Sequence, residues 1–208
     1  MLLGLDVGGT FTDAVIIDGH RVVATAKRRT TKDNLMNGIG EALDAVLEGY
    51  DTSNIEQVTL STTVVTNTIV EEKEQVVDLY VVTGPGRNVD DIFPVKPIYL
   101  QGYTDHRGIV VERTPADAVR GIANMVQTRS GTDLAAVSAK FGVRNPQEEL
   151  SITEELKNTY HTISNGSLLS GSLNFPRRTI SAYFNSAVTP VFTVFKENVE
   201  DALRARNI

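Results

Sequence analysis

A short motif near the start of the chain combines residue types that bind metal ions and phosphate. Asp6 is followed by Gly8-Gly9, with Thr10 and Thr12 directly after them. Two glycines at a turn let the backbone approach a ligand closely, and their successive N–H groups can form a concave nest for an anion. The two hydroxyls can donate to phosphate oxygens, whereas Asp6 repels phosphate and instead suits Mg²⁺ or another divalent metal. The pattern therefore predicts a metal–nucleotide site, with Asp6 on the metal and Gly8, Gly9, Thr10 and Thr12 on the phosphate.

The same residues also fit a simpler interpretation, in which Gly8-Gly9 is only a hairpin turn and Asp6 is a turn residue. Two better-known phosphate motifs do not match. No Gly-Lys-Ser/Thr follows, as a Walker loop requires, and the third glycine and the following helix of a dinucleotide fingerprint are missing. The choice between turn and site therefore depends on the rest of the chain.

Two further segments carry candidate ligand-binding side chains. Thr62, Thr63, Thr66 and Asn67 follow a predicted strand, and the carboxyl ends of strands are where open α/β sheets bind ligands. The alternative for this segment is a helix N-cap with packing of its β-branched residues. The basic run 27–29 could reach a bound phosphate from the third strand, or be a solvated strand end.

The elements that position these residues follow from the hydrophobic pattern. We predict strands over 2–7, 11–17 and 21–26, joined by tight turns into an antiparallel three-strand meander. Asp33 then caps a helix of about 15 residues. Strand character returns at 58–61, a strand-to-helix junction with one short helix follows, and the apolar run 76–83 predicts a strand buried on both faces.

The second half of the chain predicts mainly helices. Residues 88–113 form an irregular insertion or a small hairpin, with strands at 98–100 and 109–111. Helices start at Thr114-Pro115 and at Asn145-Pro146, on either side of a strand at 134–137. The segment 161–175 is a loop, and 177–206 is a long helix, broken at Pro190.

Charged side chains on the last two predicted helices have a weaker meaning. The pairs 148–149 and 154–155 are glutamates on one helix, and four such carboxylates are typical of a solvated face. Arg177-Arg178 opens the last helix at the end where cations are unfavourable, which hints at a partner or substrate anion.

Composition excludes several classes of protein. In 208 residues, 20 Lys+Arg against 26 Asp+Glu give a formal net charge of −6, which disfavours a nucleic-acid binder. The absence of cysteine excludes disulfides, thiolate zinc sites and a cysteine nucleophile. No apolar run approaches the roughly 20 residues of a membrane span, and the start is unlike a signal peptide. We therefore expect a cytoplasmic globular protein without a nucleic-acid or membrane partner.

The opening LDVGGTFTDAVIID resembles the phosphate-binding signature of the actin/Hsp70/sugar-kinase superfamily. Within it, the chain is similar to the N-terminal domain of the hydantoinase/5-oxoprolinase/acetone-carboxylase family, whose members typically read DVGGTFTD, then K-x-x-TT, then T-T-x-x-TN. The counterparts here are 6–13, 27–31 and 61–67, and further matches lie at 105–108, 141–149 and 177–185. The segment 71–74, Glu-Glu-Lys-Glu, departs from the Glu-Arg-Lys-Gly that members usually carry.

The resemblance implies a three-layer α/β fold of the ribonuclease H-like (actin-like ATPase) type, in which a mixed sheet opens with the antiparallel meander and continues through parallel strands. It implies that residues 1–208 are the N-terminal domain of a longer enzyme and one half of a two-domain ATP site. It further implies ATP and Mg²⁺ as cofactors and ATP-dependent hydrolysis of a cyclic amide, or carboxylation of a related carbonyl compound. The residues expected at the site are Asp6 for the metal, and Gly8, Gly9, Thr10, Thr12, Thr62 and Thr63 for the nucleotide.

Two other functions stay open at this stage. One is a small sugar or acetate-type kinase that shares only the superfamily motif, although the Cys-rich zinc motif of one kinase subgroup is excluded by the absence of cysteine. The other is a nucleotide-sensing or scaffold module without turnover. The hydantoinase-like interpretation requires a C-terminal domain or partner subunit to close the site, so we expect the isolated chain to be inactive.

Overall fold

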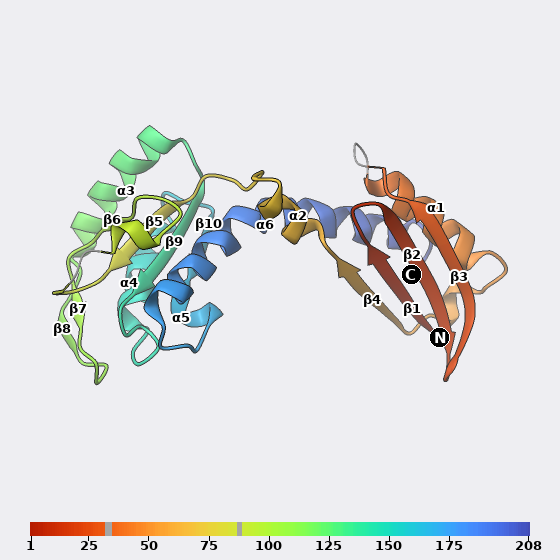
Figure 1. Cartoon of the computed structure of the whole chain (residues 1–208), viewed down its shortest axis with the longest axis horizontal. Helices are drawn as coiled ribbons and strands as arrows, with labels where there is room; N and C mark the ends of the chain where they lie inside the picture. The colour runs from red at the N-terminus through yellow and green to blue at the C-terminus, as the bar shows by residue number, and fades with distance from the viewer. Residues whose placement is uncertain (32–34, 87–88) are drawn as a thin grey trace. The chain divides into compact units, whose positions relative to one another are not determined.

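A computed structural model describes residues 1–31, 35–86 and 89–208, and the chain divides into two compact units. Unit 1 comprises Met1–Lys73 and Pro190–Ile208, and unit 2 comprises Glu74–Thr189. Figure 1 labels the helices and strands of both. Unit 2 is one continuous segment of the chain, whereas unit 1 consists of an N-terminal and a C-terminal segment. The last helix contributes residues to both units.

The sheet of unit 1 begins with the expected meander. Its strands, in the order β3-β2-β1-β4, are β1 (Leu2–Val7), β2 (Phe11–Asp18), β3 (Arg21–Arg29) and β4 (Gln57–Thr62). The pairs β1–β2 and β2–β3 are antiparallel, whereas β4 runs parallel to β1. The mixed sheet is thereby confirmed within unit 1, and the third strand is longer than the pattern indicated.

Strands β1 and β2 of unit 1 alternate between a covered and an exposed face. Leu3, Leu5 and Val7 of β1 are buried in a core with helix α1 (Leu35–Leu47) and the C-terminal part of helix α6 (Phe175–Arg204). Leu2 and Asp6, on the other face, are exposed. Asp33, the expected cap of the first helix, lies outside the described residues. The remaining elements of unit 1 are a short 3₁₀ helix (Thr52–Asn54) and α2 (Val64–Val70).

Unit 2 holds a second, all-parallel sheet instead of a continuation of the first. Its order is β10-β9-β5-β6, built from β5 (Asp78–Val82), β6 (Ile98–Tyr99), β9 (Leu134–Ala139) and β10 (Thr162–Asn165). The hairpin β7 (Tyr103–Thr104) and β8 (Val110–Glu112) is separate. Of the two alternatives for 88–113, a small hairpin is present, but β7 and β8 build it. The segments 98–100 and 109–111 do not pair with each other, since β6 joins β5 and β8 joins β7. Residue 88 lies outside the described residues.

Helices cover both faces of the unit 2 sheet, which gives three layers. One face packs on α3 (Ala116–Ser130) and α4 (Gln147–Leu156) through Val119 and Ile152. The other face packs on the N-terminal part of α6 through Ala182 and Tyr183. A short helix, α5 (Gly166–Leu169), and a 3₁₀ turn (Asp90–Ile92) complete the unit. The α/β class with a three-layer arrangement, expected from the sequence, is confirmed.

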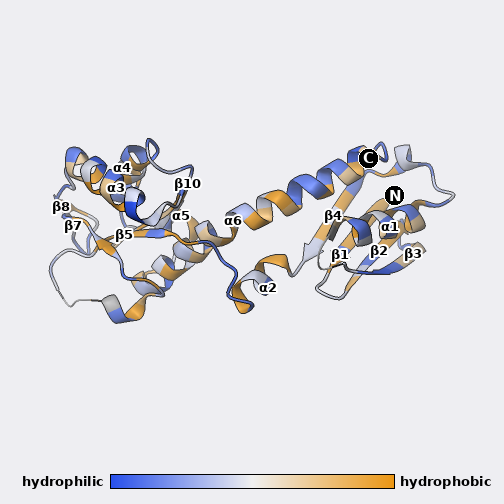
Figure 2. Ribbon diagram, turned by 90° about the horizontal axis from the view of Figure 1, so that it is seen from above, coloured by the Kyte–Doolittle hydropathy of each residue, from blue (hydrophilic) through white to orange (hydrophobic). Residues whose placement is uncertain are grey.

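Two expectations for the last third of the chain were wrong. The segment 161–175 contains β10 and α5, because its small residues sit buried against β9 and α6 rather than in a solvated loop. Helix α6 continues through Pro190. On either side of that proline, Ala187 is packed in the core of unit 2 and Phe195 in the core of unit 1. This packing outweighs the backbone hydrogen bond that the proline cannot make. Figure 2 shows the apolar and polar residues that alternate along α6.

No helix in the described ranges is both long enough and apolar enough to cross a membrane.

Candidate functional site

The turn between β1 and β2 leaves two backbone amides open. The Gly8 N–H donates to the Phe11 carbonyl at 3.0 Å and closes the turn, while the Thr30 N–H donates to the Thr10 carbonyl at 2.9 Å. Among the described residues, no hydrogen bond engages the N–H groups of Gly9 and Thr10. These successive amides are therefore available to an anion, as an anion nest requires.

The end of β4 lies beside this turn, because β1 and β4 are parallel and finish at the same edge of the sheet. The Thr63 N–H donates to the Val7 carbonyl at 3.3 Å, and the Thr62 hydroxyl donates to the same carbonyl at 3.0 Å. The Thr62 oxygen also accepts the Val64 N–H at 3.2 Å. Two segments that are far apart in the sequence are thus joined by two hydrogen bonds to the Val7 carbonyl.

A pocket of about 170 Å³ lies at this junction. It brings together four of the predicted site residues, Gly8, Gly9, Thr62 and Thr63. Val7, Val64, Asn67, Thr68, Glu71 and Lys73 complete its lining. Two valines and the charged pair Glu71 and Lys73 form part of this lining. The other lining residues contribute backbone amides, hydroxyls and a carboxamide, which are groups that bind phosphate oxygens.

A side chain on Gly9 would crowd Asn67. A Cβ at this position would stand 3.0 Å from the Asn67 side-chain nitrogen. That nitrogen donates to the hydroxyl of Thr63, the N-cap residue of α2, at 3.3 Å, so Asn67 is held against the first turn of its own helix. A residue larger than glycine at position 9 would have to displace Asn67.

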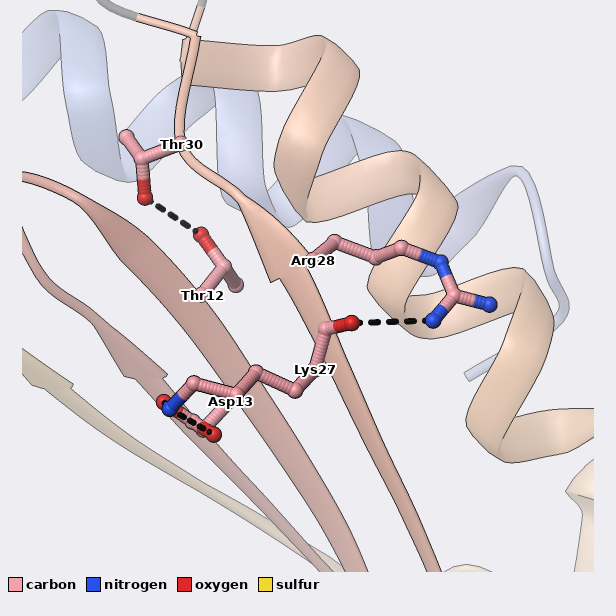
Figure 3. Close-up of polar contacts among 5 residues, drawn as sticks. All are labelled: Thr12, Asp13, Lys27, Arg28 and Thr30. Carbon is pink, nitrogen blue, oxygen red and sulfur yellow. Dashed lines mark hydrogen bonds and ion pairs between the residues drawn. The ribbon is translucent and has the colours of Figure 1, made fainter.

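The structure places Thr12 apart from this pocket. Its side chain is buried, and its hydroxyl lies 3.1 Å from that of Thr30, between β2 and the end of β3 (Figure 3). Thr10 is exposed, and its carbonyl is used by Thr30. In this arrangement Thr12 and Thr30 stabilise the turn through their hydroxyl contact and the bond from the Thr30 N–H to the Thr10 carbonyl. The backbone N–H of Thr10 is left available to an anion.

Asp6 lies on the opposite, exposed face of the sheet, where it is directly opposite Asp13 in the β1–β2 register. Lys27 donates to both Asp13 carboxylate oxygens at 2.8 Å (Figure 3). An open pocket of about 430 Å³ on this face is lined by Asp6, Asp13, Thr59 and Ser61, among others. One carboxylate with a second beside it and nearby hydroxyls is an oxygen donor set that suits a hydrated Mg²⁺. No group of three or more His, Cys, Asp or Glu side chains gathers at metal-binding distance within the described ranges.

Two residues of the basic run of β3 already have partners in β2 or in β3 itself. Lys27 is paired with Asp13, and an Arg28 guanidinium nitrogen donates to the Lys27 carbonyl at 2.9 Å (Figure 3). Neither lines the pocket at the glycine turn.

Sequence reasoning missed a group of buried charges in unit 2. Glu148 and Glu149 were expected on a solvated face but are both buried. The Glu149 carboxylate accepts the Ala139 N–H at 2.7 Å and the Ser167 N–H at 2.8 Å, and Glu148 accepts the Thr114 N–H. A signal was present, because Glu149 precedes Ile152 and Leu156 at helical spacing and so lies on the apolar face of α4.

For Arg178, the hint of a partner or substrate anion is not supported, because this side chain lies inside the protein. Its guanidinium is buried and donates to the Ser172 carbonyl at 2.7 Å and the Ala139 carbonyl at 2.9 Å. Burial lowers the pKa of Arg178, and the nearby Glu149 carboxylate opposes that shift. Arg178 and Glu149 both bond to the backbone of Ala139, one at its carbonyl and one at its N–H, so they hold the end of β9 in place.

The opening meander with its glycine turn beside a parallel fourth strand defines the class of protein, an α/β protein with the actin-like ATPase type of fold. The sequence matches the family described as hydantoinase/oxoprolinase N-terminal region over residues 2–160, so the chain belongs to the hydantoinase/oxoprolinase family. The family predicted from the motifs is thereby confirmed. None of the curated proteins matches the sequence.

Two solved structures share this fold. The nucleotide-free structure of an acetone carboxylase that performs ATP-dependent acetone carboxylation matches with a TM-score of 0.76 at 17% identity, over 99% of this chain and 34% of that chain. An ATP-dependent caprolactamase from Pseudomonas jessenii matches with a TM-score of 0.74 at 18% identity, over 96% of this chain and 33% of that chain. The chain thus spans about a third of the length of each.

Proposed function

We propose that unit 1 binds the phosphate groups of ATP as part of an ATP-dependent enzyme that acts on a cyclic amide or a related carbonyl compound. The observation that carries the proposal is the pair of open amides at Gly9 and Thr10, set beside Thr62 and Thr63 in one pocket. Membership of the family and the ATP-dependent relatives support the wider enzyme class. A hydrolytic reaction on a cyclic amide, and a cytoplasmic location, are parts of the same proposal.

The residues divide the work by chemistry. Gly8 closes the turn, the amides of Gly9 and Thr10 donate to phosphate oxygens, and the Thr62 and Thr63 hydroxyls line the opposite wall. Thr12 acts through its bond to Thr30, which keeps the turn in shape, and not by contact with phosphate. Such donors are already oriented when the ligand arrives, so binding costs little rearrangement.

Asp6 is the proposed holder of Mg²⁺, with Asp13, Thr59 and Ser61 on the same face. Asp6 does not line the pocket at the glycine turn, so a metal held by Asp6 would neutralise phosphate charge only if the ligand reaches from that pocket to this face. Lys27 limits Asp13 as a metal ligand because it already occupies both of its oxygens. Asp6 is therefore the carboxylate more open to the ion.

Calorimetry on two variants tests the division between Asp6 and the glycine turn. Gly9→Val displaces Asn67 and blocks backbone approach, so phosphate or nucleotide binding should weaken with and without Mg²⁺. Asp6→Asn should weaken only the Mg²⁺-dependent binding, because without metal the loss of a negative charge leaves anion affinity unchanged or slightly better.

Thermal unfolding of both variants serves as the control. Asp6 is exposed, so Asp6→Asn should leave the folded state intact. If Gly9→Val binds nucleotide normally while Asp6→Asn unfolds unit 1, the motif is structural and the proposed function is wrong.

A further inference from the structure

The pocket at the glycine turn is lined by one pair of opposite charges. The Lys73 ammonium donates to a Glu71 carboxylate oxygen at 2.6 Å, and both residues line the pocket with Gly9 and Thr63. The remaining lining residues are uncharged. An anion in this pocket would therefore meet a single ammonium group among the lining residues, already paired with a carboxylate.

Backbone hydrogen bonds at the end of α2 fix the position of the Lys73 backbone beside the pocket. Helix α2 ends in a Schellman motif, in which the Glu72 N–H donates to the Ile69 carbonyl at 3.2 Å and the Lys73 N–H donates to the Thr68 carbonyl at 2.9 Å. Glu72 adopts the left-handed conformation that this motif needs, with φ of 54°. The turn therefore ties Lys73 to Thr68, another residue of the pocket wall.

The charges of this turn are mostly negative. The segment 71–74 reads Glu-Glu-Lys-Glu, so Lys73 is its single cation among three carboxylates. An anion site in this pocket thus depends on one lysine, because the other charged lining residue is Glu71.

We propose that Lys73 is the charged residue that binds the anionic group in this pocket, and that Glu71 competes with that anion for Lys73. The inference rests on the proposed function, since it adds an ammonium group to the phosphate site formed by the amides of Gly9 and Thr10. In the empty pocket Glu71 holds Lys73, as observed. A multiply charged ligand such as a di- or triphosphate displaces this carboxylate, whereas a neutral or weakly charged ligand does not, so the pair selects for polyphosphate.

Isothermal titration of inorganic pyrophosphate into the whole chain, in buffer with EDTA and no divalent metal, tests both charges. Lys73→Gln should weaken binding about fivefold, a modest change because the side chain is exposed, and Lys73→Arg should retain most of the affinity. Glu71→Gln should strengthen binding by about two- to fivefold, because the competitor is removed. Both differences should shrink as salt is raised.

Lys196→Gln is the matched control. Lys196 is also an exposed lysine of unit 1 paired with a glutamate, Glu200 at 3.3 Å, but it lies on α6 and does not line the pocket. The change alters the net charge equally, so its pyrophosphate affinity should equal that of the parent chain. A weakening as large as that of Lys73→Gln would mean that only net charge matters, which would overturn the inference.

The outcomes separate the two levels of the argument. If the parent chain does not bind pyrophosphate at all, the proposed phosphate site itself is wrong. If the parent chain binds, Gly9→Val does not, and Lys73→Gln binds like the parent chain, then the phosphate site stands and the role of Lys73 is wrong. If Glu71→Gln weakens binding, Glu71 is a ligand-positioning residue and not a competitor.

Discussion

The two sheets of this protein use polar side chains in opposite ways. In unit 1, strand β1 alternates between buried and exposed positions, and its exposed face carries Asp6. In unit 2, every residue of β5 and of β9 is buried, because helices cover both faces. A polar group near the first sheet is therefore open to a ligand, while one near the second must find its partner inside the protein.

This difference explains why Glu149 and Arg178 of unit 2 bond to the backbone of the fold. Glu149 accepts a hydrogen bond from the Ala139 N–H, and Arg178 donates one to the Ala139 carbonyl, so both side chains stabilise the fold. In unit 1, the amides of Gly9 and Thr10 have no partner among the described residues, and Lys73 has only an exposed one. In this chain, exposure more than charge separates the residues proposed for binding from the residues that stabilise the fold.

The largest expected effect comes from Glu149. Glu149→Ala leaves the buried N–H groups of Ala139 and Ser167 without an acceptor, so the free energy of unfolding should fall by about 3–5 kcal/mol. Urea unfolding followed by near-UV circular dichroism measures it, because five of the six tyrosines lie in unit 2, Tyr50 being the exception. Glu154→Ala on the same helix removes only an exposed pair with Lys157 and should change stability by less than about 0.5 kcal/mol. Equal losses would contradict the comparison.

The second-largest expected effect is a fall in the free energy of unfolding of unit 2 at high pH. Burial raises the pKa of Tyr80 to about 12, and burial also raises that of Tyr160, whose hydroxyl lies 2.7 Å from that of Tyr80. A raised pKa gives stability that is present below the unfolded value near 10 and is lost as the pH rises toward 12, a loss of about 2–3 kcal/mol for Tyr80. Unfolding by urea at several values between about pH 9 and about pH 11 should show this decline. Tyr80→Phe should flatten it, and an unchanged pH dependence in that variant would assign the decline to another group.

A smaller effect is expected in the core of unit 1, at the contact of α1 with β3. A Cβ on Gly38 would stand 2.6 Å from the Arg29 carbonyl oxygen, so Gly38→Ala should cost about 1–2 kcal/mol although alanine favours helices. Gly40→Ala on the same helix meets only an arginine side chain at 3.4 Å and should gain up to about 1 kcal/mol. Hydrogen exchange of α1 amides measures both changes, and slower exchange in Gly38→Ala would show that the helix can move away from the strand.

The smallest expected effect is at the turn that carries Lys73. Glu72→Gly removes the strain of a left-handed glutamate and should raise the free energy of unfolding by about 0.5–1 kcal/mol, after the entropy cost of glycine. Gly49→Ala is the converse control, since Gly49 has φ of 82° and open space around it, and it should be destabilising by a similar amount. Thermal unfolding compares the two. A loss of stability in Glu72→Gly would mean that the glutamate side chain contributes more than the backbone strain costs.

Local patterns in the sequence determined much of unit 1 and of the sheet in unit 2. The meander followed from the glycine turn and Asp18-Gly19, and the buried strands β5 and β9 followed from unbroken apolar runs. The motif 6–13 led to the family, and Gly8, Gly9, Thr62 and Thr63 proved to share a pocket. These features depend on residues close together in the chain, or on strand ends that parallel pairing must bring together.

Long-range packing decided the rest. Tertiary contacts turned the polar segment 161–175 into β10 and α5, and carried α6 through Pro190. They also buried Glu149 and Arg178 at the end of β9, and the pairing of β4 with β1 brought the segment that carries Lys73 beside Gly9. Each of these outcomes depends on a hydrogen bond or an apolar contact with a residue distant in sequence, and such a contact forms only when the free energy of the whole fold compensates the local cost.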